Sequence, residues 1–416
     1  MTVRRNVTPW ASTGPACALA LTALLAVTSC ASGERDDSRP AAGSSSATPH
    51  GYVEGAQEAA EQQSRLLLND PGSGTTRALD LTTGKVDELA PVKGAARLAT
   101  DGRFGYLHAA GTTHVLDSGS WTVDHGDHVH YYRAAIRDVG ELPVGGAAQA
   151  RADVAVTAVT AEDGRAVLYD RGKLERGEIA RSRTLPGSYQ GAVVPYAERL
   201  LGFTGRGGTS KLAVLDRKGG RVASPDTECE DPRGDVVTRR GVVFGCADGA
   251  LLVREKDGAF TAEKISYDED VPAAERATAF RQRPGSDTVT APAGDDAVWV
   301  LDVTGRTWTR VETGPVVAAN TAGEGSPLLV LETDGALHGY DIASGEETAH
   351  TERLLTGEHP AGTADGAPVI EVDRSRAYVN DPGGKKVYEI DYNDDLRIAR
   401  SFDLDIEPVL MAETGR

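Results

Sequence analysis

A short unit recurs from residue 65 to the end of the chain, and this repeat restricts the fold more than any other feature. Each copy has an apolar pair or an aromatic residue, then Asp, then a turn that ends in Gly or a polar residue, and then another β-prone run. The copies contain Asp80, Asp117, Asp170, Asp216, Asp302, Asp341 and Asp391, with a degenerate copy near Asp257. Their spacing ranges from 37 residues, between Asp80 and Asp117, to 53 residues, between Asp117 and Asp170. Repeats of about 40–50 residues with several strands each are typical of β-propellers.

Each copy predicts a four-stranded blade. In residues 316–353 the runs VVAANT, PLLVLET, ALHGYDI and EETAHTE follow one another, and the Asp–turn step joins the third run to the fourth. Counting in this way predicts an all-β fold, a single β-propeller of eight blades. Seven is the alternative count, and a pair of β-sandwiches is the alternative fold. The first copy has room for only three strands, so we expect the apolar run at 408–413 to add an innermost strand beside residues 66–69. This closure joins the N- and C-terminal strands and removes a free sheet edge.

The charge of the chain argues against two classes of partner. The sequence has 62 acidic and 44 basic residues, which gives a formal net charge of −18. Nucleic acids and anionic membrane surfaces bind to basic patches on proteins, so we expect neither as a partner of this acidic protein. Aromatic residues make up only 5% of the chain, which also argues against stacking platforms for bases.

The first thirty residues have the pattern of an export signal. Arg4 and Arg5 precede an apolar run at 16–27, which is too short to span a bilayer as a stop-transfer helix. The run ends in Val-Thr-Ser-Cys, which resembles a bacterial lipobox, so we expect residues 1–29 to be cleaved and Cys30 to carry lipid. The alternative is an ordinary signal peptide with an incidental cysteine. Residues 31–49 are rich in Ser, Ala, Gly, Pro and charge, so a flexible tether is predicted over 30–63 and the propeller domain over 64–416.

The cysteines also indicate a protein that is exported from the cytoplasm. Cys17 would leave with the signal and Cys30 would be lipidated, which leaves Cys229 and Cys246. An even pair in an oxidising compartment predicts a disulfide. The pair flanks the β-prone runs GDVVTRR and GVVFGC, so we expect the bridge to join the start of one blade to the second strand of the same blade. A bridge that closes so short a loop contributes ~3 kcal/mol to stability in the chain-entropy model.

The second copy of the repeat carries the clearest candidate site, in the run DHGDHVH at 124–130. The chain has nine histidines, and three of them, His125, His128 and His130, fall within six positions. On an extended segment His128 and His130 point to the same face, and the intervening glycine allows a turn that brings His125 to them. Three imidazoles suit tetrahedral Zn²⁺, with Asp124 or Asp127 as a fourth ligand or a hydrogen-bonding partner, although Cu²⁺ and Ni²⁺ also favour imidazole. The alternative is a solvated turn in which the histidines are incidental.

Other histidines are weaker candidates. His359, in the run GEHPAG, lies in a loop that could approach the mouth of the central channel and is a candidate metal ligand. His50 opens the run HGYVEGA and is either a mobile metal ligand or a surface residue of the tether. The remaining histidines lie in strand-like runs and are predicted to be ordinary sheet residues: His108, His114, His338 and His350. The sequence has no G-x-S-x-G elbow, P-loop or H-E-x-x-H motif.

Five segments together resemble one family. They are PHGYVEGA at 49–56, VDHGDHVHYYRA at 123–134, VVFGCADGALLV at 242–253, RAYVNDP at 376–382 and AETGR at 412–416. The sequence is similar in these segments to AztD-type zinc metallochaperones, secreted bacterial β-propeller proteins that hand zinc to the solute-binding protein of a zinc ABC transporter. The resemblance implies a Zn²⁺ site at His125, His128 and His130. Two segments where further family histidines are expected read Tyr-Gln-Gly at 189–191 and Cys-Glu-Asp-Pro-Arg at 229–233.

The resemblance and the histidine cluster lead to the same expectation. We expect a monomeric, lipid-anchored protein outside the cytoplasm that carries zinc to a transporter's solute-binding protein and catalyses no reaction. The membrane is a partner only through the lipid. A propeller lipoprotein that binds a protein or another ligand without metal is the alternative, and a metal-dependent lactone hydrolase is a more distant one.

Overall fold

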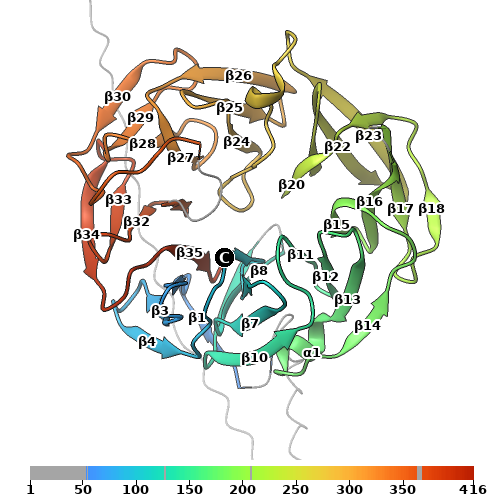
Figure 1. The fold of residues 1–416 in the computed structure, drawn as a ribbon, viewed down its shortest axis with the longest axis horizontal. Coiled ribbons are helices and arrows are strands. Elements are labelled where there is room, and N and C mark those ends of the chain that lie inside the picture. Colours follow the sequence, from blue (N-terminus) through green and yellow to red (C-terminus); the bar gives the residue numbers. More distant parts are fainter. Residues whose placement is uncertain (1–52, 54, 126–127, 207–208, 363–367) are drawn as a thin grey trace, which may run out of the picture. The chain divides into compact units, whose positions relative to one another are not determined.

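Eight antiparallel sheets follow one another along the chain and are arranged as blades around a ring (Figure 1). The computed structural model describes residues 53, 55–125, 128–206, 209–362 and 368–416. Residues Pro49–Arg416 form one compact unit. The predicted signal at 1–29, the predicted lipidation site at Cys30 and the greater part of the predicted tether lie outside the described residues. Within the described residues, no helix has the length and apolar character needed to cross a membrane.

The strands of blades 1 to 4 share one pattern, in which each sheet runs from an innermost to an outermost strand. Blade 1 contains β35 (Leu410–Thr414), β2 (Arg65–Asn69), β3 (Thr76–Asp80) and β4 (Val86–Leu89). Blade 2 contains β5 (Arg97–Thr100), β6 (Phe104–His108), β7 (Thr113–Asp117) and β10 (Arg137–Leu142). Blade 3 contains β11 (Gln149–Ala152), β12 (Val156–Thr160), β13 (Ala166–Asp170) and β14 (Arg181–Thr184), with the helix α1 (Arg171–Glu175) before the last strand. Blade 4 contains β15 (Gln190–Tyr196), β16 (Arg199–Arg206), β17 (Thr209–Leu215), β18 (Arg221–Ala223) and, also on β17, β19 (Glu228–Glu230).

The second half of the ring continues the pattern. Blade 5 contains β20 (Arg233–Thr238), β21 (Gly241–Cys246), β22 (Gly249–Lys256) and β23 (Ala259–Ser266). Blade 6 follows the 3-10 turn η1 (Ala273–Glu275) and contains β24 (Thr288–Pro292), β25 (Ala297–Asp302) and β26 (Thr307–Glu312). Blade 7 contains β27 (Val316–Thr321), β28 (Leu328–Glu332), β29 (Leu337–Tyr340) and β30 (Glu347–His350). Blade 8 contains β31 (Ile370–Val372), β32 (Ala377–Asp381), β33 (Lys386–Asp391) and β34 (Arg397–Asp403). In blade 6 a single bridge between Arg281 and Thr290 stands where the other blades have an innermost strand.

The repeated Asp has a structural reason. It ends or directly follows the third strand of its blade. Its carboxylate accepts a backbone N–H from the turn that follows, which favours that turn. The Asp80 carboxylate accepts from Thr83 N at 2.9 Å, and the Asp341 carboxylate accepts from Ser344 N at 2.7 Å. The predicted count of eight blades is confirmed, and so is the step from third to fourth strand in residues 316–353.

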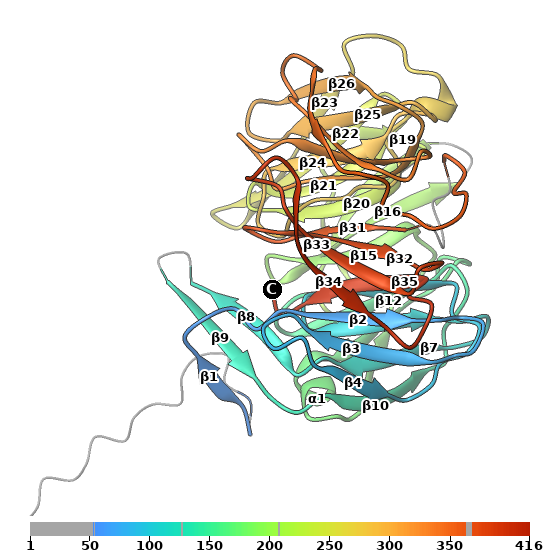
Figure 2. The same ribbon diagram turned by 90° about the vertical axis from the view of Figure 1, so that its left-hand side faces the viewer.

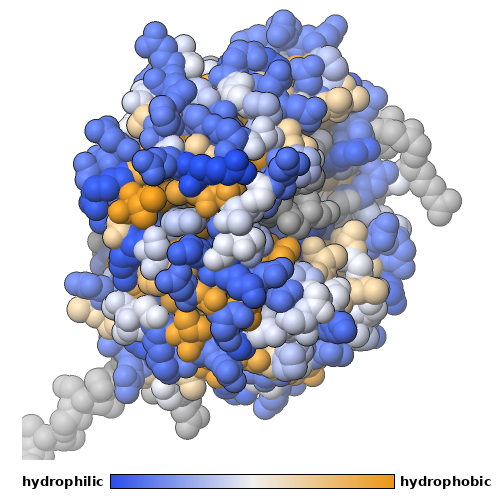
Figure 3. All heavy atoms as spheres, turned by 60° about the vertical axis from the view of Figure 1, so that its left-hand side comes forward, coloured by the Kyte–Doolittle hydropathy of each residue, from blue (hydrophilic) through white to orange (hydrophobic). Residues whose placement is uncertain are grey.

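The apolar core lies between neighbouring blades. One core cluster joins Val243 and Leu252 of blade 5 to Val289 and Trp299 of blade 6, and another joins blades 7 and 8. Strands packed on both faces lose the alternation of apolar and polar residues, as in β28, where all five residues are buried. Figure 3 looks at the side of the ring that carries β30 and β34, where hydrophilic residues predominate and hydrophobic residues form small separate patches.

The predicted closure of the ring is confirmed. The C-terminal strand β35 pairs antiparallel with β2, with Glu413 opposite Leu66 and Leu410 opposite Asn69. All five residues of each strand are buried. The last strand of the chain therefore completes the first blade, and no innermost edge is left open there.

The predicted disulfide is also confirmed, although its place in the fold differs. Cys229 and Cys246 are bonded to each other. We expected the bridge to lie within one blade, but Cys229 is on β19, which pairs with β17 of blade 4, while Cys246 ends β21 of blade 5. The bridge therefore joins two neighbouring blades.

The second copy of the repeat contains an insertion. The run after Asp117 was expected to be the outer strand of blade 2, and this is wrong, because β10 takes that place beside β7. The run forms β8 (Ser120–Asp124), which pairs with β9 (Val129–Arg133) in a hairpin, and β1 (Gln57–Ala59) adds to the other side of β9. Figure 2 shows this three-stranded sheet to one side of the ring.

Candidate metal site

The three clustered histidines lie at the tip of the inserted hairpin. His125 directly follows β8, and His130 is the second residue of β9, opposite Val123. The backbone N–H of His125 donates to the carbonyl oxygen of His128 at 2.9 Å, which closes the turn. Because side chains alternate along a strand, His128, His130 and Tyr132 share one face. The turn therefore sets His125 beside the other two histidines.

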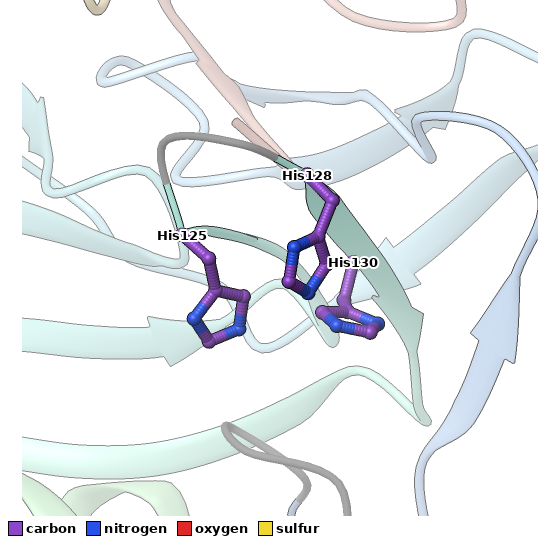
Figure 4. Close-up of side chains that lie close together, drawn as sticks. All are labelled: His125, His128 and His130. Carbon is purple, nitrogen blue, oxygen red and sulfur yellow. The ribbon is translucent and has the colours of Figure 1, made fainter.

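The rings of the three histidines gather on one side of the hairpin (Figure 4). The centroids of His125 and His128 are 4.8 Å apart and those of His128 and His130 4.9 Å, while His125 and His130 are 5.2 Å apart. One nitrogen from each ring lies within 4.8 Å of the others. His125 and His128 are exposed and His130 is half-buried, so the group faces solvent. The predicted convergence of the three imidazoles is present in the structure.

A carboxylate that the sequence did not point to contacts one of these rings. The Oε1 atom of Glu58, on β1, lies 2.7 Å from the Nδ1 atom of His130. A neutral His130 that donates Nδ1–H to Glu58 has its Nε2 lone pair available for a metal. A metal-bound histidine usually donates its other ring N–H to such a carboxylate, which fixes the tautomer and the orientation of the ring.

Below the tip, a stack of side chains connects the hairpin to blade 2. The ring of His130 lies 6.2 Å from that of Tyr132, which lies 5.4 Å from Trp121. The Arg103 guanidinium is 3.8 Å from the centre of a Trp121 ring and forms a two-pronged pair with the buried Asp117 at 2.9 and 3.0 Å. Cation–π and bidentate ion pairs of this kind restrain side chains, so the base of the hairpin is held to the propeller.

The donor set fits zinc. Neutral imidazoles bind Zn²⁺ at about 2.0–2.1 Å in tetrahedral sites, and a water or carboxylate completes a set of three. Of the two aspartates proposed as partners, Asp127 lies outside the described residues. Asp124 ends β8, and its carboxylate is 3.6 Å from an Arg239 guanidinium nitrogen.

The other histidines proposed as ligands do not join this group. His359 is half-buried in the segment between β30 and β31, and its Nε2 lies 3.3 Å from the carbonyl oxygen of Thr356. In the part of the chain that the structure describes, no group of three ligand atoms within 4.8 Å contains His359. His50 lies outside the described residues.

Two histidines that the sequence assigned only to sheet strands lie together in blade 7. His338 on β29 is directly opposite His350 on β30, and Glu347 is beside both. The signal for this grouping is the register between β29 and β30, which brings together two histidines twelve positions apart in the sequence.

Comparison with known proteins shows the fold. No protein-family model and no curated protein sequence matches the chain. The crystal structure of AztD from Citrobacter koseri is similar, with a TM-score of 0.70, 20% identity, and coverage of 85% of this chain and 98% of that one. Apo AztD from Citrobacter koseri gives a TM-score of 0.69 at 19% identity, again over 85% of this chain and 98% of that one. Dihydro-heme d1 dehydrogenase NirN, in complex with DHE, gives 0.53 at 14% identity over 84% of this chain and 75% of that one. The fold is thus an AztD-type β-propeller.

Proposed function

We propose that this protein is an extracytoplasmic zinc carrier that passes Zn²⁺ to the solute-binding protein of a zinc ABC transporter. The convergence of His125, His128 and His130 at the hairpin tip carries this proposal. The similarity of the sequence segments and of the fold to AztD proteins supports it.

The chemistry of the donors suits a carrier. Cys229 and Cys246 are joined to each other, so they supply no thiolate to a metal. The site then consists of imidazole and carboxylate groups, which release zinc more readily than a closed thiolate site does. Two of the three histidines are exposed, and the hairpin lies to one side of the ring (Figure 2). A partner protein can therefore reach the metal without opening the propeller.

The disulfide and the predicted export signal support a location outside the cytoplasm. Disulfides persist in oxidising environments and are rare in the cytosol of most cells. The bridged pair and the lipobox-like Val-Thr-Ser-Cys run are both consistent with a protein held by lipid at Cys30 on the outer face of the cell membrane. Zinc entering the cell passes through this compartment.

The first test measures zinc binding. We expect competition titration with a zinc chelator to show one zinc ion at the hairpin, and His128→Ala with His130→Ala to abolish it. His359→Ala is the matched control, because this histidine lies outside the trio. Unchanged zinc affinity in the double variant would overturn the hairpin site and favour a propeller that binds its ligand without metal there.

The second test measures transfer. The zinc-loaded protein is mixed with the metal-free solute-binding protein, and zinc in each is measured after separation. A carrier delivers zinc at a rate that rises with partner concentration, because transfer requires contact. A rate equal to spontaneous zinc release, whatever the partner concentration, would contradict the carrier function and leave only metal binding.

A further inference from the structure

We propose that the outer half of blade 7 holds a second zinc site, with His338, Glu347 and His350 as its ligands. These residues lie far from the hairpin trio in the sequence and belong to a different sheet. The inference goes beyond the proposed carrier function, because it needs only metal binding and no partner.

The three ligand atoms converge on one point. His338 and His350 are directly opposite each other on β29 and β30, with ring centroids 5.6 Å apart. Glu347 Oε1 lies 3.3 Å from His338 Nδ1 and 2.7 Å from His350 Nδ1. Ligand atoms bonded to one tetrahedral Zn²⁺ at about 2.0–2.1 Å are separated by about 3.3 Å. The distance from Glu347 to His338 already has that value. The distance from Glu347 to His350 is shorter, and the exposed His350 side chain can move outward to lengthen it.

The burial and orientation of the His338 ring are those expected of a metal ligand. It is only 9% exposed, and its Nδ1 is buried without a hydrogen bond, although it faces Glu347. A buried polar atom without a hydrogen bond is costly, and a bound cation would satisfy it. The opposite ring nitrogen, Nε2, lies 3.2 Å from Asp334 Oδ2. Donation of Nε2–H to Asp334 leaves the Nδ1 lone pair directed to the site.

A second carboxylate reinforces this orientation. Glu332 Oε2 lies 3.7 Å from His338 Nε2. Glu332 is itself fixed, since its Oε1 accepts from the Tyr340 hydroxyl at 2.5 Å and from Gly314 N at 3.0 Å. Carboxylates on the far side of a metal-bound imidazole raise its basicity and its affinity for the ion. His338 is thus supported from behind as His130 is by Glu58.

The surroundings favour a divalent cation that exchanges with solvent. The side chains of Glu347 and His350 are 40% and 63% exposed, so the ion enters directly from water. A mixed set of two imidazoles and one carboxylate is a known zinc donor set, with a fourth position left for water.

The experiment counts zinc in four forms of the full chain by zinc titration and elemental analysis. The hairpin variant carries His125→Ala, His128→Ala and His130→Ala, and the blade variant carries Glu347→Gln and His350→Ala. The third form combines both sets, and the fourth is the wild type. Only exposed side chains change in blade 7, so the buried His338 keeps its packing, and circular dichroism checks the fold.

We expect two zinc ions in the wild type, one in each single-site variant and none in the combined variant. A hairpin variant that binds no zinc overturns the blade 7 site and leaves the hairpin site standing. A blade variant that keeps the stoichiometry and affinity of the wild type also overturns it. A hairpin variant that keeps both ions contradicts the hairpin site instead, so the two failures are distinguishable. As a separate control, His359→Ala, which changes a histidine outside both groups, is expected to leave both ions in place.

Discussion

The contact between His130 and Glu58 shows how single residues prepare the hairpin for metal. Glu58 holds His130 Nδ1 at 2.7 Å, and the Tyr132–Trp121 stack lies behind the ring. In the proposed site the three histidines would supply the bonds to zinc, and Glu58 would fix the tautomer and direction of one of them. The site thus depends on a residue that does not itself belong to the trio.

Replacing Glu58 tests this role. We expect Glu58→Gln to lower zinc affinity by about 10–100-fold, because outer carboxylate partners of bound imidazoles typically contribute that much. Competition with a chelator measures the change. Glu61→Gln, an exposed carboxylate three residues along, is the control and is expected to bind as the wild type does. Equal affinity in both variants would show that Glu58 does not orient His130.

A buried histidine far from the hairpin tip predicts a dependence of stability on pH. Burial, with help from Arg97 and Arg151, lowers the pKa of His108 to about 4, below its usual 6.5. Between these values the unfolded chain binds a proton that the folded chain does not, so stability falls as pH drops from about 6.5 to 4. Over the full window this amounts to ~3 kcal/mol.

The variant His108→Gln isolates that contribution. It cannot titrate, and its amide can keep a hydrogen bond to Thr113, whose hydroxyl lies 2.8 Å from His108 Nδ1. Urea unfolding at pH 7 and pH 4 should show a loss smaller by ~3 kcal/mol in the variant than in the wild type. The same loss in both proteins would mean that His108 does not contribute to the acid sensitivity.

The residues of the trio could be predicted from the sequence, and Glu58 could not. Alternate positions of a strand share a face, so the spacing of His128 and His130 was sufficient. The contact with Glu58 joins residues 72 positions apart and depends on β1 pairing with β9. His338 and His350 were missed for a related reason, because their proximity depends on the register of β29 and β30.

Among the elements, the inserted hairpin decides where the site lies. The sequence predicted a strand after Asp117, and a strand is there, but its partner is β9 and not β7. Local composition shows that a run is β-prone without showing which strand it pairs with. The fully buried carboxylate of Asp117 binds the guanidinium groups of Arg103 and Arg137. These ion pairs anchor the point where the chain leaves blade 2.

The disulfide links two elements of neighbouring blades. Cys229 on β19 and Cys246 on β21 close a loop with a sequence separation of 17 residues. We expect Cys229→Ala with Cys246→Ala to lower the free energy of unfolding by ~3 kcal/mol, mainly through the greater entropy of the unfolded chain. Denaturant unfolding measures this. The hairpin zinc should still bind, because no cysteine is a ligand, and loss of that zinc would contradict the imidazole site.

At the scale of the whole molecule, the ring is closed by one strand. Removing residues 407–416 deletes β35, which pairs with β2 in blade 1. Each blade is stabilised by its neighbours, so we expect the whole ring to unfold at a lower temperature in one cooperative step. Calorimetry measures the shift.

A shorter truncation is the matched control. Removing residues 415–416 deletes the ion pairs of Arg416 with Glu371 and Glu413 but leaves β35 in place. The longer truncation should lower the melting temperature far more than the shorter one. Equal melting temperatures would mean that terminal ion pairs, and not strand closure, hold the ring together.

The overall architecture was the most predictable part of the protein. A repeated Asp that caps the same turn in successive blades marks the period directly, and the incomplete first copy required a strand from the C-terminus. Irregularities were not predictable, because the single bridge of blade 6 and the pairing of β19 with β17 depart from the pattern that the copies share. A repeat pattern describes what the copies share, and the inserted hairpin is where one copy departs from it.

The central claim is that one zinc ion sits among three imidazoles at the hairpin tip, and locating the ion tests it most directly. Anomalous diffraction at the zinc absorption edge, from crystals of the zinc-loaded protein, places the metal without reference to any variant. We predict an anomalous peak bonded to nitrogens of His125, His128 and His130. Zinc-loaded crystals with no peak at this tip would contradict the account.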